Sequence, residues 1–267
     1  MPAIAGVLGI LVGAGCGEDA DPKATSLRIV VTDPSANRFR YSAPASVAAG
    51  LVRITLVNRG KREHKAQLWR IRGDHSGAEA VAAHRPLPDW LRYEGGVGET
   101  APGESAVVVQ RLAPGRYYIA DRGSDKGRLA AFAVRGNDTA AELPSTKGSI
   151  VMKDYSFTPS GLKPGPNSVE ISNEGFEPHH TLVAPVKRGD SSVGDLRRFL
   201  KGTGPIPVGD VVDLERAEET SVIEQGQKQV VRLRLKRGTY GLLCFVPDRK
   251  GGPPHVAKGM VDKLTVR

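Results

Sequence analysis

The chain has 267 residues, of which 39% are hydrophobic and 25% are charged. These values are close to those of soluble globular proteins and exclude a collagen, a coiled coil and a multi-span membrane protein. Its 32 Gly and 19 Pro favour short strands joined by turns. The formal net charge of +9 suits an anionic membrane surface, an acidic partner or nucleic acid. Two cysteines, Cys16 and Cys244, are too few for a disulfide framework.

The N-terminal segment carries no charge as far as Gly17, and its apolar stretch ends in three small residues directly before Cys16. It is short for a membrane span of about twenty residues. The segment resembles a bacterial lipoprotein signal, in which the cysteine is lipidated and becomes the mature N-terminus. The resemblance implies a signal over residues 1–16, a tether over 17–26 and an extracytoplasmic protein anchored to the bacterial cell membrane by lipid on Cys16. The alternatives are a short membrane anchor and an ordinary buried segment.

From Leu27 onward the chain consists of short runs rich in β-branched residues, with Gly, Pro and Asn between them, which predicts strands. Examples of the predicted strands are residues 27–31, 50–58, 106–112, 116–120 and 129–134.

Residues 231–237 alternate apolar and basic side chains, so a strand there would bury Val231, Leu233 and Leu235 and expose the cations. No aromatic residue is interleaved for base stacking, so we expect a solvated face and no nucleic-acid partner.

A polar linker is predicted at residues 137–147, and the strand pattern then begins again. The spacing Asn-x-Gly-x-x-x-His occurs at both Asn58 and Asn173, and Gly-x-Tyr occurs at both Gly115 and Gly238. This repeat predicts an all-β chain with two tandem Greek-key β-sandwich domains, residues 27–136 and 148–267. One short surface helix is expected in each domain, at residues 77–84 and 192–201.

Four side chains of the second domain form the set with the clearest chemistry: His179, Cys244, His255 and Met260. Taken alone, a cysteine in a strand is most often a small buried hydrophobe. Two imidazoles and a thiolate in a plane, with a thioether as a weak axial ligand, form the blue-copper electron-transfer site. The joint occurrence of the four residues therefore indicates copper.

Residues 173–181 and 240–266 resemble the cupredoxins, the plastocyanin and azurin family, in which Asn precedes Pro-His and Tyr, Cys, His and Gly-Met precede a last strand. The resemblance covers most of residues 148–267. It implies His179, Cys244 and His255 as equatorial ligands and Met260 as the axial ligand of one type 1 copper ion. It also implies that His255, on a loop near the surface, is the electron port.

Ten residues separate Cys244 from His255, more than in small cupredoxins. Gly251 to Pro254 favour a tight turn that returns His255 to the site. His180, next to His179, is expected to point to the opposite face of a strand, toward solvent.

The first domain lacks the ligand set, since the repeat places Asp121 opposite Cys244 and no His or Met follows as far as Arg135. His64 alone cannot hold copper, so we expect a cupredoxin-like domain without metal.

These observations predict a lipoprotein that is not an enzyme and that transfers single electrons to a redox partner protein, for which an acidic surface fits the net charge. The sequence contains no Gly-x-Ser-x-Gly elbow, phosphate loop or His-Glu-x-x-His motif. Two alternatives stay open: a metal-free cupredoxin-like binding and interaction module, and a protein of copper storage or delivery.

Overall fold

The computed structural model describes residues 24–35, 38–83, 86–121, 129–138, 141–187 and 208–267. Cys16 with its apolar segment and the helix predicted at residues 192–201 lie outside the described residues. The described part consists mainly of strands, so the predicted all-β class is confirmed. Within it, no helix is long and apolar enough to cross a membrane.

The described residues of the N-terminal half form nine strands and one short helix. They are β1 (Thr25–Ser35), β2 (Arg38–Ser42), β3 (Ser46–Ala48), β4 (Gly50–Asn58), β5 (His64–Ile71), α1 (Gly77–Ala82), β6 (Leu91–Thr100), β7 (Ser105–Leu112), β8 (Gly115–Ala120) and β9 (Ala130–Arg135). The predicted strands all occur, with ends within two residues of the prediction except at the first. The predicted helix is α1, whose N-terminus is capped by Ser76.

In the C-terminal half, residues 148–187 and 208–267 form eight strands, one α-helical turn and one 3₁₀ turn. They are β10 (Gly148–Lys153), β11 (Ser156–Ser160), β12 (Gly165–Asn173), β13 (Leu182–Pro185), α3 (Val208–Val211), β14 (Glu218–Glu219), β15 (Lys228–Leu235), β16 (Gly238–Leu243), η2 (His255–Lys258) and β17 (Val261–Val266). In β15 the apolar residues are buried and Arg232 and Arg234 are exposed, which confirms the predicted alternation.

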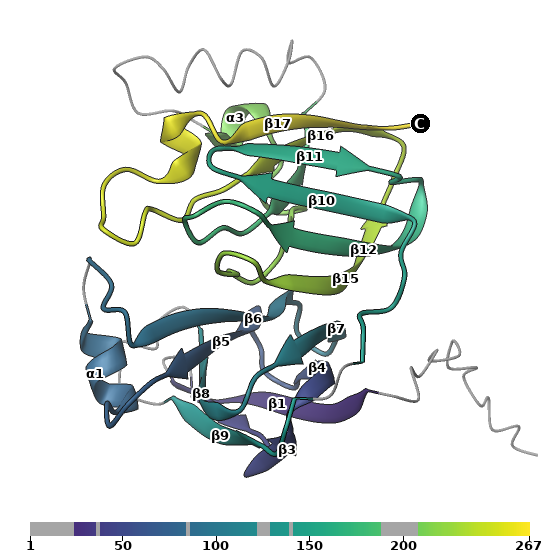
Figure 1. Ribbon diagram of the computed structural model, residues 1–267. Coiled ribbons are helices and arrows are strands. Elements are labelled where there is room, and N and C mark those ends of the chain that lie inside the picture. The colour runs from purple at the N-terminus through teal and green to yellow at the C-terminus, as the bar shows by residue number, and fades with distance from the viewer. Residues whose placement is uncertain (1–23, 36–37, 84–85, 122–128, 139–140, 188–207) are drawn as a thin grey trace, which may run out of the picture.

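Each half is a sandwich of two sheets, and one sheet is common to both (Figure 1). The shared sheet has eight strands in the order β11-β10-β12-β15-β7-β4-β1-β2. A five-stranded sheet, β3-β9-β8-β5-β6, faces it in the N-terminal half, and a four-stranded sheet, β14-β13-β16-β17, faces it in the C-terminal half. The division of the chain at residues 137–147 stays a prediction.

The halves meet where β15 pairs antiparallel with β7, with Val230 opposite Val109 and Val231 opposite Val108. One buried apolar cluster runs through both halves, from Leu27 and Ile54 to Ile171 and Leu242. Burying each such side chain contributes about 1.5 to 3 kcal/mol. Because strand pairing and core are both shared, the C-terminal half is held in a fixed position against the N-terminal half.

A buried amide strengthens this contact. The Gln67 side chain, on β5, donates from Nε2 to the carbonyl oxygens of Gly95 and Val222, each at 3.0 Å. Its Oε1 accepts the backbone N–H of Val222 at 2.7 Å. Since Gln67 is only 4% exposed, water cannot replace these bonds if the amide is removed.

The substitution Gln67→Met removes the amide and keeps the length of the side chain. We expect the free energy of unfolding in urea to fall by about 1 to 3 kcal/mol, because the N–H of Val222 is left buried without a partner. Thr158→Met, at an exposed position of β11, is the control and should change stability by less than about 0.5 kcal/mol. An unfolding midpoint of Gln67→Met at the same urea concentration as that of the wild type would contradict this role.

Candidate metal centre

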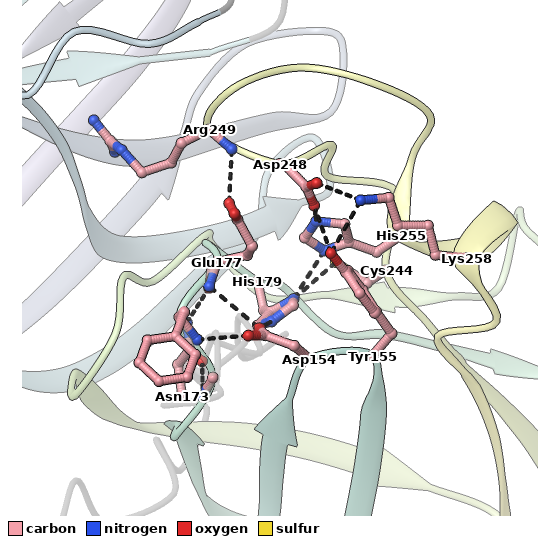
Figure 2. A network of polar contacts seen from close by, with 12 residues as sticks. Asp154, Tyr155, Asn173, Glu177, His179, Cys244, Asp248, Arg249, His255 and Lys258 are labelled. Atoms are coloured by element: carbon pink, nitrogen blue, oxygen red, sulfur yellow. Dashed lines mark hydrogen bonds and ion pairs between the residues drawn. The ribbon is translucent and has the colours of Figure 1, made fainter.

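Three side chains from separate segments of the C-terminal half converge in its core. His179 lies between β12 and β13, Cys244 directly follows β16, and His255 begins η2. One potential ligand atom of each lies within 4.8 Å of those of the other two, and all three residues are 0% exposed. Figure 2 shows the two imidazoles facing each other next to Cys244. The structure thus brings three of the four predicted ligands together.

The segment before His179 is fixed by backbone and amide hydrogen bonds. The Asn173 side chain donates to the carbonyl oxygens of Glu177 at 2.8 Å and Ile223 at 3.0 Å. The backbone of His179 exchanges two hydrogen bonds with Ile223, at 3.0 and 2.9 Å. The Asn-x-Gly-x-x-x-His spacing seen in the sequence is therefore a turn that closes on Asn173 and directs His179 inward.

Cys244 and His255 are held together through their backbones. The N–H of Val256 donates to the carbonyl of Cys244 at 2.7 Å, and the N–H of His255 donates to that of Val246 at 2.9 Å. The intervening loop turns at Gly251 and Gly252, whose φ angles of 95° and 109° favour glycine. The predicted tight turn is thus present, and it returns His255 to the site.

The two imidazoles present the same ring nitrogen to the centre of the cluster. Nδ1 of His255 lies 2.9 Å from Nδ1 of His179. The Sγ atom of Cys244 lies 3.8 Å from Nδ1 of His179 and 3.6 Å from Nδ1 of His255. Each Nε2 instead faces a carboxylate, that of Asp154 at 2.8 Å for His179 and that of Asp248 at 2.9 Å for His255.

These carboxylates determine the tautomers. An ionised carboxylate only accepts hydrogen bonds, so Asp154 and Asp248 place the ring protons on Nε2. In the neutral imidazole each Nδ1 then carries a lone pair, and the two lone pairs face each other beside the Cys244 sulfur. No proton is left to join them, so the cluster fits a cation.

Burial keeps all three donors neutral when no metal is bound. It lowers the pKa of His179, and together with the neighbouring His179 it lowers the pKa of His255 to about 4. Burial raises the pKa of the Cys244 thiol to about 12. Burial alone would raise the pKa of Asp248, but hydrogen bonds from Lys258 and Tyr155 lower it below its ordinary value.

Met260, the fourth predicted ligand, is 0% exposed and belongs to the same apolar cluster as Cys244. Its backbone N–H donates to the carbonyl of His255 at 3.0 Å. Two imidazoles and a thiol that binds metal as thiolate are three of the four donors of a type 1 copper centre, and Met260 as the thioether donor stays a prediction.

Two expectations about the histidines are wrong. The His255 side chain is not at the surface, because the long loop places Asp248 against its Nε2 and Tyr155 packs on its ring at 5.0 Å between centroids. Lys258 donates to the Tyr155 hydroxyl and pairs with Asp248, which completes the cover. His180 is 5% exposed, because its Nε2 accepts the backbone N–H of Phe245 at 2.9 Å.

The N-terminal half has a hydrogen-bonded cluster at the equivalent place. Nδ1 of His64 faces Asp121 at 2.7 Å, and its Nε2 faces Asp33 at 3.0 Å. Asp121 directly follows β8 as Cys244 directly follows β16, as the repeat predicts, and its carboxylate is hydrogen-bonded to the imidazole. Among the described residues, the cluster of His179 is the only group of three metal-binding side chains found.

The carboxylates that orient the imidazoles were not predicted from the sequence. Isolated aspartates are common, and nothing near Asp248 distinguishes it from an ordinary loop residue. Asp154 had a detectable signal, since Asp33 and Asp154 each lie two residues beyond the strand partner of the repeated Asn and face His64 and His179 in the same way.

No protein-family model matches the chain, and no curated protein matches it. Among solved structures, auracyanin B is similar at 18% identity and a TM-score of 0.28, over 48% of this chain and 93% of that one. An auracyanin from the photosynthetic bacterium Roseiflexus castenholzii has 19% identity and a TM-score of 0.27, over 45% of this chain and 94% of that one. A copper nitrite reductase from Nitrosomonas europaea has 12% identity and a TM-score of 0.24, over 91% of this chain and 93% of that one.

The two β-sandwiches of this chain and its His-Cys-His cluster agree with the cupredoxin-like fold that the sequence indicates.

The lowered pKa of His255 predicts how the metal-free protein responds to acid. Between pH 6.5, the ordinary value, and about 4, the unfolded chain binds a proton at this ring that the folded protein does not. This contribution to stability is therefore complete above pH 6.5 and is lost as the pH falls toward 4. Urea unfolding across this range should show a smaller loss in His255→Gln than in the wild type, and equal losses would contradict the prediction.

Proposed function

We propose that this protein is a single-electron carrier with one type 1 copper ion, held by His179, Cys244, His255 and Met260. The observation that supports it most strongly is the pair of imidazole Nδ1 atoms, 2.9 Å apart, with each Nε2 on a carboxylate. Thiolate and thioether donors suit Cu(I) and imidazoles suit Cu(II), so copper would supply one-electron chemistry at this site.

Each residue has a separate part in this function. Cys244 binds as the thiolate and gives up its proton, since burial keeps the metal-free thiol protonated. Asp154 and Asp248 hold the ring protons on Nε2, which keeps both Nδ1 atoms ready for the metal. The surrounding strands keep the donors in place and exclude water.

Burial favours an electron carrier over an enzyme. The residues His179, Cys244, His255 and Met260 are each 0% exposed, whereas catalytic metal sites keep a position open for water or substrate. An electron can cross the thin cover formed by Asp248, Tyr155 and Lys258, but a substrate cannot reach the ligands while that cover is in place. The net charge of +9 supports a redox partner with an acidic surface.

The first test is the visible spectrum of the chain from Glu18 onward after addition of Cu(II). We expect an intense blue thiolate-to-copper band, its loss in Cys244→Ala, and its retention in the control His75→Ala, whose ring lies at the surface beside Glu79. A colourless protein that binds no copper would contradict the proposal and favour the binding module. A colourless protein with readily exchangeable copper would favour storage or delivery.

We also propose that lipid on Cys16 anchors the protein outside the cytoplasmic membrane, which the apolar segment ending in small residues supports. In a bacterial host that processes lipoproteins, the wild-type chain should partition into the detergent phase of Triton X-114. Cys16→Ser should lose the lipid mass in a mass spectrum and move to the aqueous phase. A wild-type chain without lipid would reject the anchor and leave the copper proposal intact.

A further inference from the structure

The long loop between Cys244 and His255 contacts the N-terminal half of the protein. In Figure 1 this yellow loop reaches toward the segment between α1 and β6. The backbone N–H of Leu87 donates to the carbonyl of Arg249 at 2.7 Å. The Arg249 guanidinium donates from Nη2 to the carbonyl oxygens of Pro88 and Leu91, each at 2.9 Å. Three hydrogen bonds therefore join one loop residue to residues 87–91.

Arg249 also binds the segments that surround the metal centre. Its backbone N–H donates to the carboxylate of Glu177 at 2.7 Å, as Figure 2 shows. Glu177 lies two residues before His179 in the sequence. The Nη1 atom of Arg249 pairs with Oε1 of Glu224 at 2.5 Å. That oxygen also accepts the backbone N–H of Tyr93, on β6, at 3.1 Å.

These contacts are shielded from water. The Arg249 side chain is 14% exposed and that of Glu224 is 2% exposed. Charge-assisted hydrogen bonds in such surroundings are strong, and removal of one member leaves a buried charge without its partner. The planar guanidinium donates from one nitrogen to the carboxylate and from another to two carbonyls, a spacing that the single nitrogen of a lysine does not match.

The position of Arg249 bears directly on His255, because Asp248 is the preceding residue and its carboxylate faces Nε2 of His255 at 2.9 Å. A shift of Arg249 would move Asp248 and release the ring. A short loop between Cys244 and His255 would not extend to residues 87–91. The extra length of this loop thus has a physical use.

We propose that Arg249 is a positioning residue through which the N-terminal half fixes the orientation of His255, so that the metal centre depends on both halves of the chain. The effect of Arg249 on the metal rests on the proposed copper function. Its contacts with residues 87–91, Glu177 and Glu224, which we call the Arg249 clamp, are present without metal. The half that lacks the ligand set thereby takes part in the metal centre.

The clamp is tested first in the metal-free full chain by hydrogen exchange. Arg249→Ala should lower protection of the amides of residues 246–258. Arg92→Ala is the matched control, because Arg92 also pairs with Glu224, at 3.3 Å, and no hydrogen bond or ion pair is found between Arg92 and the described loop residues 245–254. Protection of the loop should be unchanged in the control. Unchanged protection in Arg249→Ala would overturn the proposal, whether or not the protein binds copper.

The effect on the metal is tested in the copper-loaded chain by release of Cu(I) to a chelator, together with the position of the visible band. Arg249→Ala should release copper about tenfold faster or more and shift the band, whereas Arg92→Ala should stay within about twofold of the wild type. Arg249→Lys keeps the charge, and its rate of copper release should lie between those of Arg249→Ala and the wild type. This intermediate rate separates a positioning role from loss of the fold. Wild-type release and band position in both Arg249 variants would overturn the proposal. A wild-type chain that never binds copper would reject the function and leave hydrogen exchange to decide on the clamp.

Discussion

The metal centre depends on one constraint: two buried imidazoles present lone pairs to each other. The carboxylates of Asp154 and Asp248 require the ring protons on Nε2, and the fold brings the opposite nitrogens to 2.9 Å beside the sulfur of Cys244. Without a cation this arrangement has no attraction of its own. The sheets, the turn at Asn173 and the loop before His255 must therefore supply the energy that maintains it, and the shared core of the two halves provides it.

The two halves surround the histidine of the Asn-x-Gly-x-x-x-His turn with different partners. In the N-terminal half a carboxylate, Asp121, stands where Cys244 stands in the other, and His64 is held between two aspartates. In that cluster both ring nitrogens of His64 already have a carboxylate as hydrogen-bond partner, so no ring nitrogen is left for a metal. The repeated framework can thus hold either an imidazole hydrogen-bonded between two carboxylates or a set of metal donors, and the side chain that follows β8 or β16 makes much of the difference.

Much of the fold was predictable from the sequence, because apolar and polar side chains alternate along the strands. The repeated spacing at Asn58 and Asn173 also shows that the two halves have related strands. The convergence of His179, Cys244 and His255 was predictable because the cysteine ends a strand and the Gly/Pro-rich loop after it leads to His255. Met260 as the fourth ligand stays a prediction. The burial of His255 was not predictable, since it depends on where ten loop residues fold. That path is determined by contacts of Arg249 with backbone carbonyls of Pro88 and Leu91, more than a hundred residues away in sequence, for which no local pattern exists. His180 was misplaced because a backbone N–H, that of Phe245, replaces water as its partner.

The central claim is that a soft cation lies between the two Nδ1 atoms and the Cys244 sulfur. X-ray absorption at the copper edge of the loaded protein tests it most directly, because sulfur and nitrogen neighbours scatter differently. We expect a first shell with one short sulfur bond and two imidazole nitrogens, and loss of the sulfur component in Cys244→Ala. A shell of oxygen and nitrogen alone in the wild type would show that copper is held elsewhere and would contradict the assignment of this site.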